Sequence, residues 1–214
     1  MRYERSRMLF GDDFEKLRKA KILLLGVGGV GSFCLDCLIR SGIDDITIVD
    51  FDTYDESNQN RQLWSEHHLG ESKVHALKTH YPQVTVIERR IDPAWVETFD
   101  FGPYDLVLDA IDDTQAKLAL AQHCWQKLIS ATGSAKRLDP TKIEVATIWK
   151  THGDRFAAKL RYELKKRRFN RKYPVIFSSE PPRVKVKGSF MAVTGAFGLT
   201  MCSLAVRRIV EKAE

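Results

Sequence analysis

The sequence has few cysteines and no long apolar run. Its four cysteines (Cys34, Cys37, Cys124 and Cys202) are too few for a disulfide framework and suit a reducing compartment. No run of about 18 apolar residues is present, so we expect no membrane span. The N-terminal stretch MRYERSRMLF lacks the apolar segment of a signal peptide, and we therefore expect a cytoplasmic protein.

The basic residues are distributed unevenly along the chain, whose net charge is +6. From Lys150 to Lys187, thirteen Lys and Arg residues face only three acids, so this segment carries +10 and the rest of the chain carries −4. A slightly acidic body with a basic C-terminal third predicts a polyanionic partner, and RNA is the natural candidate. A solvated helix face with extra lysines is the alternative.

A short apolar strand, a glycine-rich turn and a helix follow one another from Lys21. The stretch Ile22–Leu25 is expected to be a strand buried on both faces of a parallel sheet. The next residues read GVGGVG, a G-x-G-x-x-G turn that contains Gly26, Gly28, Gly29 and Gly31. A helix to about Arg40 and a second strand that ends on Asp50 complete a β-α-β unit.

This β-α-β unit predicts a nucleotide site in a Rossmann-like sheet. The glycines allow the backbone to approach a phosphate, and the helix N-terminus offers unpaired N–H groups and a positive dipole end. Asp50 is placed where a carboxylate can hold ribose hydroxyls. A glycine-rich turn without a nucleotide is the alternative.

The run that follows resembles the signature of the ThiF/MoeB/ubiquitin-activating (E1-like) superfamily. It reads VDFDTYDESNQNRQ and contains Asp52, Asn58 and Arg61. A dinucleotide dehydrogenase has no need for Asn58, Arg61 and Lys73 beside the phosphates. A carboxylate-adenylating enzyme does, because charge builds up on the α-phosphate and on the leaving pyrophosphate. The resemblance therefore favours ATP over NAD, and it implies a mostly parallel α/β sheet flanked by helices.

Two further segments match the superfamily pattern. The N-terminal R-Y-E-R, followed by Gly11, implies that Arg5 reaches the ATP phosphates of the other subunit in a homodimer. The sequence D-A-I-D-D, after the fourth expected strand, matches D-x-x-D-[NDS] and implies that Asp112 ligates a Mg²⁺ ion bridging the phosphates. Capping the following helix is the other role open to Asp112, while Asp109 is expected to be structural or to orient the residues that contact the ligand.

The C-terminal half resembles more narrowly the tRNA threonylcarbamoyladenosine dehydratase family. The matching stretches are DPTKI, FAAKLR with Lys165, and PVIFSSE, of which F-S-[ST]-E is the most specific. The likeness implies that ATP adenylates the threonyl carboxylate of N6-threonylcarbamoyladenosine beside the tRNA anticodon. The carbamoyl oxygen then closes a ring with overall loss of water. The implied catalytic residues are Arg61, Lys73, Asp112 and Arg5 of the partner subunit.

The cysteine positions are consistent with this narrower resemblance. Relatives that activate ubiquitin-like or sulfur-carrier proteins commonly carry zinc on two Cys-x-x-Cys pairs, or use a cysteine after the fifth strand. Here Cys34 and Cys37 lie in the first helix with no second pair, and no cysteine lies between Cys124 and Cys202. An intramolecular ring closure needs no enzyme thiol. An E1-like adenylyltransferase acting on a small carrier protein, and a basic RNA-binding module with a vestigial nucleotide unit, are the alternatives.

We interpret the chain as a single domain. Residues 1–20 are expected to form a helical arm, 21–135 the nucleotide-binding core, and 136–214 the rest of the sheet with a basic helix and a closing helix. The side chains expected to hold the tRNA backbone are Lys159, Arg161, Lys165, Lys166, Arg167, Arg168, Arg171, Lys172, Arg183, Lys185 and Lys187. Sulfur-relay proteins are further candidate partners, and no membrane is expected among the partners.

Overall fold

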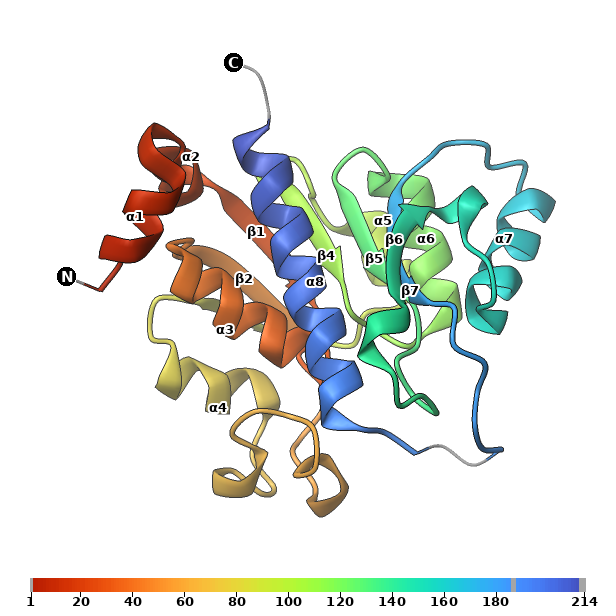
Figure 1. Cartoon of the computed structure of the whole chain (residues 1–214), viewed down its shortest axis with the longest axis horizontal. Helices are drawn as coiled ribbons and strands as arrows, with labels where there is room; N and C mark the ends of the chain where they lie inside the picture. The colour runs from red at the N-terminus through yellow and green to blue at the C-terminus, as the bar shows by residue number, and fades with distance from the viewer. Residues whose placement is uncertain (1, 186–187, 212–214) are drawn as a thin grey trace.

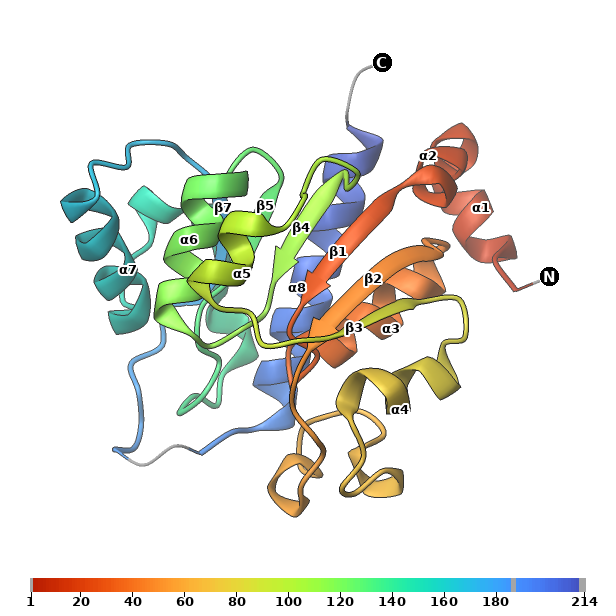
Figure 2. The same cartoon turned by 180° about the vertical axis from the view of Figure 1, so that it is seen from behind.

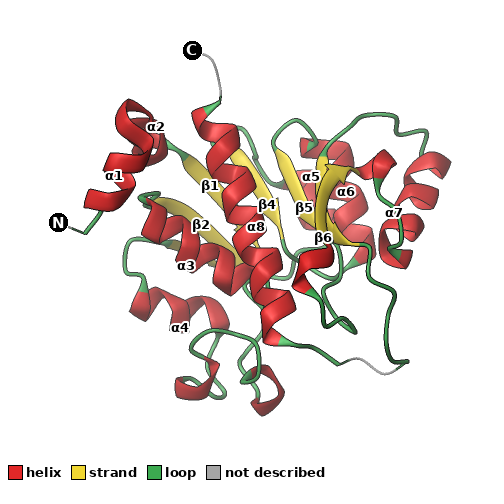
Figure 3. Ribbon diagram, in the orientation of Figure 1, coloured by secondary structure: helices red, strands yellow, loops and turns green. Residues whose placement is uncertain are grey.

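The computed structural model describes residues 2–185 and 188–211 and centres on one seven-stranded sheet (Figures 1 and 3). The strands are β1 (Lys21–Leu25), β2 (Asp45–Asp50), β3 (Thr85–Glu88), β4 (Leu106–Asp109), β5 (Leu128–Ala131), β6 (Ile143–Thr147) and β7 (Pro174–Ser178). Their order is β3-β2-β1-β4-β5-β7-β6, and all neighbours pair in parallel except β6, which is antiparallel to β7. The predicted mostly parallel sheet is confirmed.

Helices cover both faces of this sheet, as the two opposite views show (Figures 1 and 2). One face carries α2 (Phe14–Lys19), α3 (Gly31–Ser41), α4 (Lys73–His80) and α8 (Met191–Val210). The other face carries α5 (Pro93–Thr98), α6 (Thr114–Cys124) and α7 (Arg155–Lys166). The first helix, α1 (Glu4–Phe10), has no buried residue and lies beside the amino ends of β1 and β2.

The central position of β1 follows from its composition. Ile22 and Leu24 pack into the core on one face of the sheet, while Leu23 and Leu25 pack into the core on the other. All four side chains are fully buried. A strand covered on both faces needs an apolar residue at every position, which is what the sequence predicted.

The basic helix α7 begins at Arg155. The carboxylate of Asp154 accepts hydrogen bonds from the amides of Phe156 (2.7 Å) and Ala157 (3.0 Å), so Asp154 is the N-cap that sets the start. After α7, Tyr173 is buried against the core.

The closing helix α8 packs on α3 and on the sheet, as expected. Among the described residues it is the one helix long and apolar enough to cross a membrane, and 56% of that window is buried inside the protein. Its apolar character therefore matches its contacts with α3, β5 and β7.

The close approach of α8 to α3 depends on Gly198. A Cβ there would lie 2.3 Å from the carbonyl oxygen of Val30. Because that atom belongs to the backbone, Gly198→Ala should lower the free energy of unfolding by about 1–3 kcal/mol in a urea titration. Gly195→Ala is the matched control, since its Cβ would meet only the ring of Phe33, at 3.5 Å. Equal destabilisation by both substitutions would contradict this account of the packing.

Candidate nucleotide site at the carboxyl edge of the sheet

The glycine-rich turn connects the end of β1 to the start of α3. Gly26 has a φ of +82°, and a Cβ there would lie 3.0 Å from the carbonyl oxygen of Ala110. A Cβ at Gly31 would lie 1.9 Å from the carbonyl oxygen of Gly26. Both positions therefore require glycine, and the turn folds tightly over the end of β4. It leads directly into the N-terminus of α3, which can bind a phosphate through its N–H groups.

Arg61 lies against this turn. A Cβ at Gly29 would lie 3.3 Å from both the Cγ atom and the carbonyl oxygen of Arg61. The guanidinium is held by two hydrogen bonds, from Nη1 to the carbonyl oxygen of Ser57 (2.6 Å) and to Oδ1 of Asn60 (2.9 Å). The fold therefore brings a cation predicted to neutralise phosphate charge next to the glycine-rich turn.

Asp50 ends β2 and faces the same turn. Its buried carboxylate accepts hydrogen bonds from the Val27 amide at Oδ2 (2.8 Å) and from the Asp52 amide at Oδ1 (3.0 Å). These bonds fix the orientation of the carboxylate. Each oxygen keeps a second lone pair, so both can still accept from ribose hydroxyls.

Lys73 is the first residue of α4 and is only 5% exposed. Its Nζ lies 3.0 Å from Oδ2 of Asp52, and its amide donates to the carbonyl oxygen of Asp52 (3.0 Å). The side chain of Asp52 is about half exposed, so this ion pair sits at the protein surface rather than in the core. Asp52 therefore positions the ammonium group of Lys73, which a triphosphate can contact from the exposed side.

Asn58 is buried within the loop between β2 and Arg61. It forms a capping box with Asp55: its Nδ2 donates to Oδ1 of Asp55 (3.0 Å), and the Asp55 amide donates to its Oδ1 (3.4 Å). Hydrogen bonds from Ser57 lower the pKa of Asp55, which keeps this carboxylate ionised. The observed role of Asn58 is thus to shape the loop that carries Arg61, and its contact with a nucleotide stays a prediction.

The three acidic residues at the end of β4, Asp109, Asp112 and Asp113, have different roles. Asp109 is buried beside Lys117 and is structural, as predicted. Asp113, and not Asp112, caps α6 by accepting from the Ala116 amide (2.8 Å), so the capping alternative for Asp112 is wrong.

Asp112 is exposed just beyond the carboxyl end of β4. The described residues contain no group of three or more His, Cys, Asp or Glu side chains that could hold a metal, so Mg²⁺ binding stays a prediction.

A family model described as the ThiF family matches residues 3–214. The chain belongs to the ThiF family. The tRNA threonylcarbamoyladenosine dehydratase of Bacillus subtilis is 36% identical to it over 194 residues, which span 85% of this chain and 76% of that protein. The crystal structure of the Escherichia coli tRNA N6-threonylcarbamoyladenosine dehydratase in complex with ATP superposes with a TM-score of 0.91 at 30% identity. That match covers 97% of this chain and 93% of the other.

Similarity to another branch of the ThiF family is less extensive. The ubiquitin-like modifier-activating enzyme 5 of Aedes aegypti is 31% identical over 135 residues, which span 55% of this chain and 34% of that protein. The superfamily resemblance predicted from the run after Asp50, and the narrower one predicted from PVIFSSE, are therefore both confirmed.

The N-terminal arm of this ThiF-family chain lies far from its own glycine turn. Arg5 is exposed on α1, beside the amino ends of β1 and β2, whereas the turn leaves the carboxyl end of β1 (Figures 1 and 2). Arg5 therefore does not reach the turn within its own subunit. Only a second subunit can provide the predicted contact between Arg5 and the phosphates, and that contact stays a prediction.

The basic residues predicted to bind RNA do not form one cluster. The basic end of α7, Lys165 and Lys166, leads through a short connection to Pro174 at the amino end of β7, so it lies at the edge of the sheet opposite the nucleotide site. Several of these cations also have partners within the protein: Lys159 with Thr114, Arg161 with Thr151, Lys166 and Arg167 with Glu163, and Arg171 with the Trp125 ring.

The connection between β7 and α8, by contrast, lies at the nucleotide edge of the sheet. It contains Arg183 and Lys185, and Asn60 donates to the carbonyl oxygen of Ser189 in the same connection (3.1 Å). Asn60 also contacts the guanidinium of Arg61, so this connection runs beside the loop that carries Arg61. Lys159 lies at the same edge of the sheet, since its Nζ is 3.4 Å from Oγ1 of Thr114, the first residue of α6. Lys187 lies outside the described residues.

One buried polar network beyond β5 was not predicted from the sequence. Thr132 and Arg137 both donate to Oδ2 of Asp154, at 2.7 and 3.0 Å, and all three residues are buried. The sequence does not distinguish Arg137 from its neighbour Lys136. The one available signal is its position shortly after a strand that ends at the ligand-binding edge.

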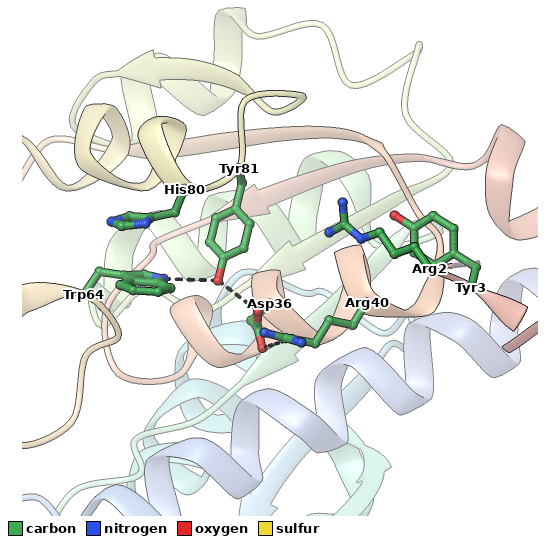
Figure 4. A pocket seen from close by; sticks show the side chains of 7 residues that line it. All are labelled: Arg2, Tyr3, Asp36, Arg40, Trp64, His80 and Tyr81. Atoms are coloured by element: carbon green, nitrogen blue, oxygen red, sulfur yellow. Dashed lines mark hydrogen bonds and ion pairs between the residues drawn. The ribbon is translucent and has the colours of Figure 1, made fainter. Parts of the chain in front are cut away.

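A pocket of about 350 Å³ lies away from this site, between the N-terminal segment, α3 and α4 (Figure 4). In it, Trp64 donates to the hydroxyl of Tyr81 (3.2 Å), which donates to Asp36 (2.9 Å). The ring of His80 stacks on Trp64 with 3.8 Å between centroids. These contacts attach the loop that follows Arg61 to the C-terminal end of α4.

The same loop is held by a pair of imidazoles. Nε2 of His68 and Nε2 of His80 are 2.8 Å apart, and Nδ1 of His68 is 2.9 Å from Oε2 of Glu71. A hydrogen bond between two ring nitrogens needs one N–H and one lone pair, so the two rings cannot both be charged while it exists. The contact is therefore stable only when at least one of the rings is neutral.

We expect the protein to lose stability as the pH falls below about 6.5. Burial and the nearby rings of His68 and His67 hold the pKa of His80 below its ordinary value. The unfolded chain then binds a proton that the folded chain excludes. The contribution of neutral His80 to the free energy of unfolding is therefore complete above its unfolded pKa of about 6.5. This contribution is lost as the pH falls through the pKa of His80 in the folded protein. Urea midpoints at about pH 7.5 and about pH 5.5 measure the effect.

Two variants assign this pH dependence to His80. His80→Phe keeps a ring on Trp64 but removes the titrating group, so its midpoint should change less with pH than that of the wild type. His75→Phe is the control on the same helix, because His75 is exposed and pairs with Glu88 (3.1 Å). An unchanged pH dependence in His80→Phe would show that another group is responsible.

Proposed function

We propose that this chain is an ATP-dependent tRNA threonylcarbamoyladenosine dehydratase. The observation that carries the proposal is its similarity, along nearly the whole of both chains, to the Escherichia coli enzyme described with ATP. In the proposed reaction a threonyl carboxylate oxygen attacks the α-phosphorus of ATP, and pyrophosphate leaves. The carbamoyl oxygen then attacks the acyl carbon, AMP leaves, and a proton is lost as the ring closes.

The geometry at the carboxyl edge supports this chemistry. The glycine turn and the N-terminus of α3 would bind the phosphates, and Asp50 would hold the ribose. Arg61 and Lys73 lie where they can offset the negative charge that develops on the α-phosphate and on the leaving pyrophosphate. Positively charged groups fixed in advance stabilise such charge without reorganising during the reaction.

We also propose that Asp112 holds Mg²⁺ at this site. Mg²⁺ takes most of its ligands from phosphate oxygens and water, so one or two protein carboxylates are sufficient. Asp112 is exposed beyond the end of β4, and Ala110 at that same end packs against Gly26 of the phosphate turn. The carboxylate of Asp112 therefore follows the strand next to β1, the strand from which the glycine turn leads to the expected triphosphate.

The cysteines favour ring closure within the substrate over transfer to an enzyme thiol. All four lie in helices: Cys34 and Cys37 in α3, Cys124 in α6 and Cys202 in α8. Burial raises the pKa of Cys34 and raises that of Cys124 to about 12, so neither forms a thiolate readily. A hydrogen bond with Cys202 lowers the pKa of Cys37, but this thiol is partly buried against the core between α3 and α8. The alternative, adenylation of a carrier-protein C-terminus, has less support because the modifier-activating relative matches little more than half of this chain.

The proposed partners follow from the reaction. A tRNA anticodon loop would deliver the nucleoside, and Arg183 and Lys185, in the connection beside the loop of Arg61, would contact its backbone. A homodimer would bring Arg5 of the partner subunit to the phosphates, since Arg5 is remote from its own site. We expect the enzyme to act in the cytoplasm, where tRNA is modified, and a sulfur-relay protein is a further candidate partner.

Nucleoside mass spectrometry tests the proposed function. In tRNA from a strain that lacks this gene, the cyclic nucleoside should be absent and its open precursor should accumulate. Purified protein with ATP and Mg²⁺ should then convert that tRNA, so that the nucleoside becomes lighter by one water. Unchanged nucleosides in the deletion strain would contradict the proposal. Carrier protein linked to AMP, found by intact mass after mixing with candidate carriers, would support the alternative.

A further inference from the structure

Arg137 is a charged residue in a buried position, just beyond the carboxyl end of β5. It is only 5% exposed, whereas the next residue, Leu138, is 46% exposed. The chain thus buries a guanidinium and exposes a leucine, the reverse of the usual preference. Lys136, on the other side, has a φ of +70°, a left-handed conformation that is uncommon for a residue other than glycine. Such conformations are often found at functional sites.

The guanidinium of Arg137 is only partly paired. Nη2 donates to Oδ2 of Asp154 (3.0 Å), but Nε and Nη1 are buried without a hydrogen-bond partner among the described residues. Since Nε carries one N–H and Nη1 carries two, three charged donors lack an acceptor. Buried charged donors are rarely left in this state, because the loss of water around them is not compensated. The structure therefore points to an acceptor from outside the chain.

Asp154 cannot satisfy these donors as well. Its Oδ1 accepts from the amides of Phe156 and Ala157 at the N-terminus of α7, and its Oδ2 accepts from Thr132 (2.7 Å) and from Arg137. Four donors thus share one negative charge. The N-terminus of the 12-residue helix α7 adds further positive potential at this point. The missing acceptor is therefore expected to be an anion.

The position relative to the phosphate turn indicates which anion. Ser130 of β5 pairs with Asp109 of β4, and β4 leads to Ala110, which touches Gly26. Neighbouring strands are about 4.8 Å apart, so the end of β5 lies about 10 Å from the end of β1. At the end of β5, Gly133 has open space where a Cβ would project. The segment of Arg137 also reaches the loop of Arg61, since the Lys136 amide donates to the carbonyl oxygen of Gly188 (2.8 Å) and Asn60 donates to that of Ser189 (3.1 Å).

We propose that Arg137 binds the carboxylate that is to be adenylated. This proposal rests on the proposed function. One carboxylate oxygen would accept from Nε or Nη1, while the other attacks the α-phosphorus. The bond from that phosphorus to the bridging oxygen then breaks, and pyrophosphate leaves with the electron pair. Arg137 would distinguish a carboxylate from its uncharged counterparts, a task separate from the phosphate contacts of Arg61 and Lys73.

Binding of two matched RNAs tests this assignment. One is an anticodon stem-loop with N6-threonylcarbamoyladenosine, and the other is the same RNA with its carboxylate converted to a carboxamide. Wild-type protein should bind the carboxylate RNA about 10–100-fold more tightly, as expected for charged hydrogen bonds in a buried site. In Arg137→Met the two RNAs should bind equally, with the affinity for the carboxamide RNA unchanged. Arg137→Lys should keep part of the preference.

A structural control separates recognition from support of the fold. Thr132→Val disturbs the same Asp154 network but leaves the guanidinium in place, so it should keep the preference for the carboxylate RNA. Calorimetry of ATP binding confirms that each variant is folded. If Arg137→Met keeps the full preference while the wild type adenylates the carboxylate RNA, the assignment of Arg137 is wrong and the proposed function stands. If the wild type does not adenylate that RNA at all, both proposals are wrong.

Discussion

Lys73→Met is expected to lower the rate of ATP–pyrophosphate exchange by a factor of about 10²–10³, the usual effect of removing a fixed group that stabilises charge in the transition state. Exchange is measured with the threonylcarbamoyl tRNA as the acyl substrate. The side chain of Lys73 is buried, and its ammonium lies 3.0 Å from the half-exposed carboxylate of Asp52. Its loss removes positive charge at the point where negative charge grows. Affinity for tRNA should stay close to that of the wild type, because the effect is confined to the phosphates.

Lys78→Met is the matched control for this prediction. Lys78 lies on the same helix, but its Nζ donates to the carbonyl oxygen of Val84, at the other end of α4. The same loss of charge from α4 should therefore leave the exchange rate nearly unchanged. Arg61→Ala should resemble Lys73→Met, because Arg61 lies against Gly29 of the phosphate turn. Exchange at the wild-type rate in both Arg61→Ala and Lys73→Met would exclude these residues from the phosphate site.

The sequence was sufficient to predict the elements whose signal is local. The apolar run of β1 and the G-x-G-x-x-G pattern of the turn can each be recognised within a few consecutive residues. Position within the site was also predictable where it follows from the end of a strand, as it does for Asp50. The cap of α6 shows the limit of this reasoning, since Asp112 and Asp113 are adjacent and chemically identical. Only the direction of the backbone makes Asp113 the N-cap.

Contacts between distant segments were not predictable from local pattern. Counting charges predicted a basic C-terminal third, but the count does not show that the end of α7 and Arg183 lie at opposite edges of the sheet. The same holds for Arg137, whose burial depends on Asp154 and on Thr132 at the end of β5. A charged side chain in a loop is normally exposed, and only the tertiary structure identifies the exception.

The buried ion pair between Lys117 and Asp109 leads to the largest expected effect on stability. Lys117 is 1% exposed, and its Nζ lies 2.8 Å from both carboxylate oxygens of Asp109 and 2.7 Å from the carbonyl oxygen of Ala131. Lys117→Met would leave the carboxylate buried, and among the described residues its remaining donors would be Ser130 Oγ (2.6 Å) and the Ile111 amide (3.2 Å). We expect the free energy of unfolding to fall by about 3–5 kcal/mol, because an unpaired buried charge is not compensated.

A second substitution separates the unpaired charge from the loss of packing. In Lys117→Met/Asp109→Leu both charges are replaced by apolar side chains, so most of the lost stability should return. Lys166→Met is the surface control: Lys166 is exposed and 3.6 Å from Glu163, and its loss should cost less than about 1 kcal/mol. Urea denaturation of the four proteins measures all three differences. If the double variant is less stable than Lys117→Met alone, the ion pair contributes through its shape and hydrogen bonds, and not through the compensation of a buried charge.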